Sequence, residues 1–261
     1  MHNRGLSIIL SILNLVGLIC VVIVNILANA LPINDKTTGE LSNQYPNLFV
    51  PAGLTFSIWG LIYILLAMFV VYSLICAFRT GEKRSFIGSI SIFFFLTCIA
   101  NIGWIFAWHY EILPLSMILM ILLLASLIAI YLRLSIGKSN ASNLEKYMVH
   151  LPFSVYLGWI TIATIANATA LLVAANWNAF GLGEQFWAVG VILIAVALTL
   201  AVVLQRRDIF FGLVVDWALI GILIKRLADP IPYQSVIVTT IAGLILISLG
   251  ILLQIMRRKV Y

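Results

Sequence analysis

Eight long apolar segments dominate this sequence and constrain its fold more than any other feature. A helix that spans a membrane needs about 20 mostly apolar residues, whereas a membrane strand needs about 10 residues of alternating polarity. The runs here are long and continuous, which favours helices, because helices satisfy their own backbone hydrogen bonds in the bilayer core. They cover residues 6–31, 54–78, 86–108, 115–134, 149–175, 186–204, 209–224 and 234–256. The sequence therefore predicts an all-α, polytopic membrane helix bundle with eight transmembrane helices.

The composition agrees with an integral membrane protein. Of the 261 residues, 63% are apolar and 9% are charged, and the mean hydropathy is +1.15. A soluble domain is nearer half apolar and a quarter charged. So few charged side chains cannot cover a water-facing surface, which excludes a soluble enzyme, a disordered tail and a disulfide scaffold. The net charge of +6 does not indicate a nucleic-acid partner, because the basic residues form small clusters between apolar segments.

The distribution of basic residues predicts the orientation. With a cytoplasmic amino terminus, the cytoplasmic side carries twelve basic residues and the opposite side carries three, Lys36, Lys225 and Arg226. The twelve are Arg4, Arg79, Lys83, Arg84, Arg133, Lys138, Lys146, Arg206, Arg207, Arg257, Arg258 and Lys259. Cytoplasmic loops of membrane proteins are enriched in Lys and Arg. We therefore expect a multi-pass protein of the bacterial cytoplasmic membrane, with both termini cytoplasmic and the polar, turn-rich first loop (residues 32–51) outside.

Amides and aromatic rings form stripes on three of the predicted helices. The stripes comprise Asn14, Asn25 and Asn29; Asn101, Trp104 and Trp108; and Tyr156, Trp159, Ala163 and Asn167. The spacing places the members of each stripe on one helical face. Such faces either line a shared cavity or hold helices together through interhelical hydrogen bonds, each worth about 0.6 kcal/mol on average. The residue pattern leaves both interpretations open.

Asp216 is an acidic residue in the middle of an apolar segment. A charge at that depth costs about 2.5–3.5 kcal/mol on insertion scales, so the carboxyl group should be protonated, paired or turned toward a polar cavity. It either makes a structural hydrogen bond to a neighbouring helix or serves as a proton relay. Cys20, Cys76 and Cys98 lie in apolar segments and are expected to be buried thiols. No His, Cys and carboxylate spacing indicates a metal site, and no catalytic triad can be assembled at one membrane depth.

Three sequence blocks resemble the TspO/MBR family (translocator protein, tryptophan-rich sensory protein). The stretch from Pro51 to Tyr63, PAGLTFSIWGLIY, resembles the start of the family's second helix. The block NIGWIF, from Asn101, is similar to its third helix. The block YLGW, from Tyr156, with ATIAN following it, is similar to its fifth helix. Together the blocks cover about residues 6–178.

This resemblance implies a five-helix bundle, often dimeric, with an internal pocket for flat apolar ligands such as porphyrins and with the first loop as its lid. Carried over position by position, the implied ligand-binding residues are Trp59, Asn101, Trp104, Tyr156, Trp159 and Asn167. It implies no resident cofactor, since a porphyrin or haem precursor would be the ligand. Membrane lipid, an apolar small molecule and a second copy of the chain are the expected partners.

The sequence also departs from the family pattern. Residue 168 is Ala, where many members have an aromatic residue after the matching Asn, and the first loop lacks the usual Trp and paired prolines. Three further helices follow the common fold. We therefore expect a TspO-like domain over residues 1–180 and a three-helix transmembrane extension over residues 181–261.

These features lead to one main hypothesis and two alternatives. The main hypothesis is a non-enzymatic membrane receptor or carrier for a planar apolar ligand, such as a tetrapyrrole. The first alternative is a proton-coupled small-molecule transporter that uses Asp216 as a relay. The second alternative is a membrane enzyme that modifies a tetrapyrrole, which the absence of an aromatic residue at position 168 disfavours.

Overall fold

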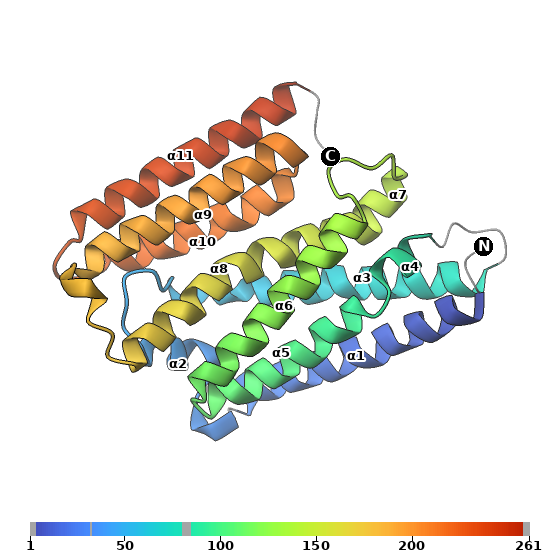
Figure 1. The fold of residues 1–261 in the computed structure, drawn as a ribbon, viewed down its shortest axis with the longest axis horizontal. Helices are drawn as coiled ribbons and strands as arrows, with labels where there is room; N and C mark the ends of the chain where they lie inside the picture. Colours follow the sequence, from blue (N-terminus) through green and yellow to red (C-terminus); the bar gives the residue numbers. More distant parts are fainter. Residues whose placement is uncertain (1–3, 32, 80–84, 258–261) are drawn as a thin grey trace. The chain divides into compact units, whose positions relative to one another are not determined.

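Helices form at all eight predicted segments. The computed structural model describes residues 4–31, 33–79 and 85–257, and this part of the chain contains helices and no strand (Figure 1). The α-helices are α1 (Arg4–Ala30), α2 (Thr38–Gln44), α3 (Ile58–Phe78), α4 (Ser85–Ile90), α5 (Phe93–His109), α6 (Leu113–Arg133), α7 (Asn143–Glu145), α8 (Leu151–Ala174), α9 (Glu184–Arg206), α10 (Ile209–Leu227) and α11 (Gln234–Met256). The predicted all-α membrane bundle is confirmed. The basic residues Lys83, Arg84, Arg258 and Lys259 lie outside the described residues.

The length and hydropathy of six helical segments are sufficient for crossing a membrane. Within the described residues these are Arg4–Ala30, Gly53–Phe78, Leu113–Arg133, Asn143–Ala174, Glu184–Arg206 and Gln234–Met256. The other two predicted spans are the apolar but shorter α5, of 17 residues, and α10, which contains Asp216, Lys225 and Arg226. The chain is thus a multi-pass membrane protein, and its orientation stays a prediction.

The chain forms two compact units. The first contains Met1–Thr38 and Trp59–Leu157, and the second contains Gly39–Ile58 and Gly158–Tyr261. Helix α8 begins in the first unit and continues into the second. The predicted division into residues 1–180 and 181–261 stays a prediction.

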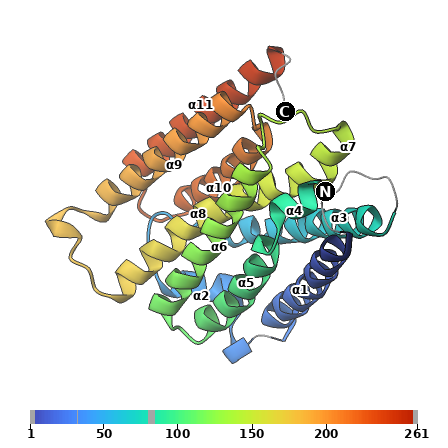
Figure 2. The same ribbon diagram turned by 45° about the vertical axis from the view of Figure 1, so that its right-hand side comes forward.

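In the first unit, α5 packs against both α1 and α6, and the three helices lie side by side in both views (Figures 1 and 2). Buried aromatic rings from α3, α5 and α8 form its core. Phe69 makes edge contacts with Phe94 and Phe153, with ring centroids 5.1 and 4.9 Å apart. All three side chains are fully buried. Edge-to-face pairs of this kind contribute about 0.5–1.5 kcal/mol each beyond their burial.

The third predicted helix is interrupted, contrary to the single segment expected over residues 86–108. Ser91, between α4 and α5, has a φ of 52°, which is the left-handed region that L-residues other than Gly rarely adopt. The Arg133 guanidinium donates from Nε to the carbonyl of Ser89, 2.6 Å away, and so satisfies a group that the interruption leaves without a helical partner. The first loop, predicted to be polar and turn-rich, contains the short helix α2.

In the second unit, α9, α10 and α11 pack against one another. Glycines allow this close approach. A Cβ on Gly212 of α10 would lie 2.8 Å from Val203 of α9, and a Cβ on Gly243 of α11 would lie 2.7 Å from Val196 of α9. Small residues at helix contacts are typical of membrane bundles, where van der Waals packing replaces the hydrophobic effect. Segment 51–57 docks on this bundle, since the Ala52 N–H donates to the Gly221 carbonyl, 2.9 Å away.

Candidate functional site

Two buried amides and a phenol connect three helices of the first unit. The Asn25 side chain on α1 donates from Nδ2 to Oδ1 of Asn101 on α5, 2.8 Å away. The Asn101 Nδ2 in turn donates to the hydroxyl of Tyr156 on α8, 3.4 Å away. All three side chains are less than a tenth exposed. In the hydrocarbon layer no water replaces these partners, so the residues hold one another in fixed orientations.

Two partly exposed rings of α3 lie next to this network. Trp59 stacks on Tyr63, one helical turn away, with ring centroids 5.5 Å apart and an interplanar angle of 19°. Trp59 also contacts Tyr156 edge-on at 6.1 Å. The Tyr63 hydroxyl is buried and interacts with the Asn101 side chain, although no hydrogen bond of ordinary geometry forms with a described residue. We refer to Asn25, Trp59, Tyr63, Asn101 and Tyr156 as the Tyr156 cluster.

Three of the six predicted ligand-binding residues are therefore linked, because Trp59 and Asn101 both contact Tyr156. Tyr63 and Asn25 were absent from the predicted set, although the i, i+4 spacing of Trp59 and Tyr63 and the stripe containing Asn25 indicated them. The fourth residue, Trp104, lies on α5 one turn from Asn101 and stacks on Trp108, with ring centroids 5.8 Å apart. Both of those indoles are buried.

The other two predicted residues belong to the second unit. Trp159 is buried and contacts Phe56 edge-on, with ring centroids 6.0 Å apart. Asn167 is also buried, on the same helix α8. The prediction that all six residues line one ligand cavity stays a prediction.

Asp216 is buried on α10, where 7% of its surface is exposed. The Ser248 hydroxyl on α11 donates to its Oδ2 atom, 3.1 Å away. The Oδ1 atom has no hydrogen-bond partner within the described part of the chain. Only one oxygen of the carboxyl group is therefore hydrogen-bonded within the described residues, and a role for Asp216 as a proton relay stays a prediction.

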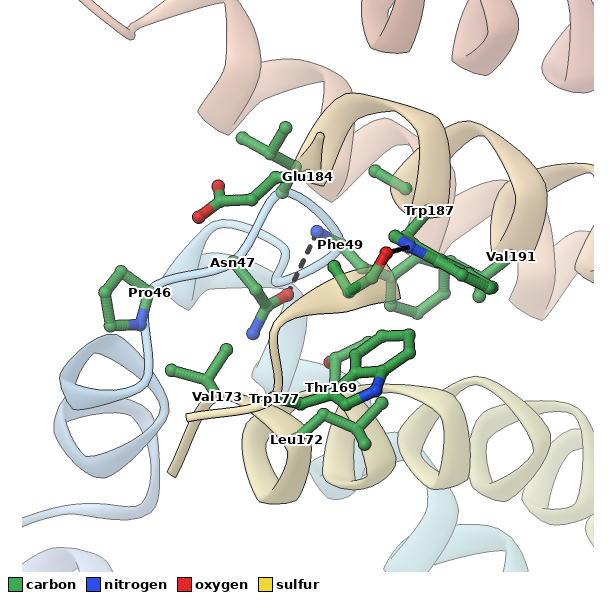
Figure 3. Close-up of a pocket in the computed structure, with 13 residues that line it drawn as sticks. Pro46, Asn47, Phe49, Thr169, Leu172, Val173, Trp177, Glu184, Trp187 and Val191 are labelled. Atoms are coloured by element: carbon green, nitrogen blue, oxygen red, sulfur yellow. Dashed lines mark hydrogen bonds between the residues drawn. The ribbon is translucent and has the colours of Figure 1, made fainter. Parts of the chain in front are cut away.

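A pocket of about 470 Å³ lies elsewhere in the second unit (Figure 3). Segment 46–49 of the first loop, the last turns of α8, the α8–α9 connection and the first turns of α9 form its walls. The lining residues are Pro46, Asn47, Leu48, Phe49, Thr169, Leu172, Val173, Trp177, Ala179, Glu184, Trp187, Ala188 and Val191. This volume falls in the range of about 300–1,000 Å³ that is usual for small-molecule sites.

Comparison with known protein families shows to which family this chain belongs. The family described as TSPO-like protein matches residues 11–253. The chain belongs to this family. No curated protein and no solved structure matches it. The match includes all of α9 and α10 and reaches residue 253 of α11, so the three C-terminal helices belong to the region that the TSPO-like description covers.

The pocket of this TSPO-like protein was not predicted from the sequence. Its two indoles, Trp177 and Trp187, are ten residues apart and flank a connection that contains Gly181 and Gly183, which is the available local signal. Segment 46–49, which forms another wall, lies more than 100 residues earlier in the chain, so no local sequence pattern indicates that it belongs to the pocket. Among residues 4–31, 33–79 and 85–257, no group of three or more His, Cys, Asp and Glu side chains is arranged to hold a metal ion.

Proposed function

We propose that this TSPO-like protein is a non-enzymatic membrane receptor or carrier that binds a planar apolar ligand of the tetrapyrrole class. The proposed site is the Tyr156 cluster, with Trp104 of the same unit as a further contact. One observation carries the proposal: the Trp59–Tyr63 stack is partly exposed, and it lies against a buried and internally hydrogen-bonded amide network. Membership of the family supports the same function.

Each part of the cluster has a separate role in this proposal. The partly exposed indole of Trp59 offers a face for a flat ring system, and a stacked pair adds about 0.5–1.5 kcal/mol beyond burial. The Tyr63 hydroxyl, which has no hydrogen bond of ordinary geometry, supplies one orienting contact to a polar edge of the ligand. Asn101 and Tyr156 bond to each other, and so position the ring that Trp59 contacts. Few polar contacts in an apolar site are usual for ligand pockets.

Titration with protoporphyrin tests the proposal. The protein in an uncharged detergent is titrated while the porphyrin absorbance band is followed, so the seven tryptophans need not be resolved. We expect Trp59→Ala to weaken binding about tenfold, because one stacking face and its burial are lost. Trp217→Phe is the control, since Trp217 lies in the second unit and donates to the Thr55 carbonyl. Unchanged binding of protoporphyrin by the Trp59→Ala variant would contradict the proposal.

Asp216 supports a second candidate, a proton-coupled transporter in which its carboxyl group relays protons. The half-satisfied carboxyl group favours this candidate, because Ser248 occupies Oδ2 while Oδ1 stays available to a proton or a mobile donor. Intramembrane ionisable residues commonly mark proton pathways. Receptor and transporter are compatible, since a carrier must first bind its ligand.

A further inference from the structure

The pocket of the second unit is shaped by two local turns. Helix α8 ends with Asn176 in the left-handed region at a φ of 51°, and the Trp177 N–H donates to the Leu172 carbonyl, 3.1 Å away. This is the Schellman pattern of helix termination, and it fixes the direction of Trp177. In the first loop, the Asn47 side chain accepts from the N–H groups of Phe49 and Val50, at 3.0 and 3.1 Å. This turn buries Leu48 and Phe49.

One side of the pocket is aromatic. The rings of Trp177 and Trp187 are 5.0 Å apart at an interplanar angle of 58°, and both are partly exposed. The Trp187 N–H is occupied, because it donates to the Ala179 carbonyl, 3.0 Å away. Trp187 therefore presents an apolar ring face to the pocket rather than a hydrogen-bond donor. A flat apolar group is the complement of such a surface.

The charge of the pocket comes from one residue. Among the described residues that line it, Glu184 is the sole charged side chain. The amide of Asn47 and the hydroxyl of Thr169 already bond to backbone groups. The Glu184 carboxylate makes no ion pair or hydrogen bond with a residue that the structure describes. Figure 3 shows it near Pro46 and Asn47, whereas Trp177 and Trp187 lie on the other side of the pocket.

We propose that this pocket binds an amphipathic organic cation, with its flat apolar body against Trp177 and Trp187 and its ammonium group at Glu184. The volume of about 470 Å³ admits such a molecule. This site shares no residue with the Tyr156 cluster, so its test is independent of the tetrapyrrole proposal. An anionic ligand of the same shape would be disfavoured, because no cationic side chain among the described lining residues offsets the Glu184 charge.

Glu184 also has a structural role that the experiment must separate. It is the first residue of α9, and a carboxylate in the first turn of a helix interacts favourably with the helix dipole. Loss of that interaction would lower the stability of the protein and would affect the binding of all ligands equally, whatever their charge. A change in charge selectivity, in contrast, reports a direct interaction between Glu184 and the ligand.

Three probes that share one naphthalene ring system and differ in charge test whether the pocket selects a cation. Naphthylethylammonium, naphthylethanol and naphthylacetate carry a positive charge, no charge and a negative charge on the same ring system. Binding to the full chain in an uncharged maltoside detergent is measured by equilibrium dialysis, with empty micelles subtracted. We expect the order cation, neutral, anion. Glu184→Gln should weaken the cation about threefold, as for an exposed ion pair, and leave naphthylethanol unchanged.

Two further variants address the aromatic side. Trp187→Leu should weaken all three probes about tenfold, whereas Trp187→Phe, which keeps a ring face, should stay within about twofold of the unchanged protein. Glu111→Gln is the control for the change in net charge, since Glu111 is a glutamate of the first unit that pairs with Lys36. Equal binding of cation and anion, or a Glu184→Gln protein with unchanged selectivity, overturns the proposal. Because Glu184 is exposed, Glu184→Gln is expected to fold even where Trp187→Leu does not.

Discussion

Asn25 donates a hydrogen bond to Asn101 across 2.8 Å and so joins α1 to α5 inside the first unit. The two residues are 76 positions apart in the sequence. Asn101 is fully buried, and its side-chain amide donates a second hydrogen bond to the Tyr156 hydroxyl. The pair thus connects the packing of the helices with the orientation of the ring that contacts Trp59, the residue on which the proposed tetrapyrrole site depends.

Asn25→Ala should destabilise the protein by about 1 kcal/mol, because Oδ1 of Asn101 loses its donor without gaining water. Interhelical hydrogen bonds in membranes average about 0.6 kcal/mol and reach about 1.7, less than the roughly 1–3 kcal/mol for an unsatisfied buried group in a soluble core. Reversible unfolding in mixed micelles measures the difference. Asn29→Ala is the control, since the Asn29 amide bonds to the Asn25 carbonyl of its own helix. Equal stability losses in both variants would contradict the assignment.

Gly221→Ala should displace the docked segment 51–57 from α10. The added Cβ would lie 2.9 Å from the Thr55 Cβ and 3.0 Å from the Pro51 Cβ, closer than carbon atoms pack. We expect a loss of about 1–3 kcal/mol and faster proteolysis of this segment, as is usual for an overpacked contact. Gly190→Ala, in the middle of α9 with no neighbour within 4 Å, is the control. It should stabilise the helix by about 0.5–1 kcal/mol. A protein that tolerates both substitutions equally would show that the contact at Gly221 is not close.

Asp216→Asn should abolish the dependence of uptake on a proton gradient if the carboxyl group is a relay. The amide keeps the shape and can still accept from Ser248, but it cannot exchange a proton at neutral pH. The measurement is protoporphyrin uptake into proteoliposomes with and without an imposed pH gradient. Ser248→Ala, the matched control, removes the hydrogen bond and keeps the carboxyl group. Full gradient-driven uptake by Asp216→Asn would contradict the relay.

The apolar runs predicted the helices well because each run reflects burial in lipid, which acts along the whole segment. The interruption at Ser91 could not be predicted in this way. The Ser89 carbonyl beside the interruption accepts from Arg133, a residue 44 positions later in the chain. Nothing in the local sequence from Phe86 to Phe93 signals that partner.

The Tyr156 cluster was partly predictable, because its residues repeat at helical spacing. Asn101 and Tyr156 were found in this way, whereas Trp59 came from the resemblance to the TspO/MBR family, in a block that also contains Tyr63. The pocket beside Glu184 was not found. Its walls combine Asn47 and Phe49 of the first loop with Trp177 and Trp187, and only the fold brings these distant segments together.

A density map of the protein with bound protoporphyrin tests the central claim most directly. The account predicts a macrocycle in van der Waals contact with the Trp59 ring, and a polar edge of the ligand within hydrogen-bond distance of the Tyr63 hydroxyl. A macrocycle bound away from α3, or Trp59 and Tyr63 still stacked with no ligand beside them at saturating porphyrin, would contradict it.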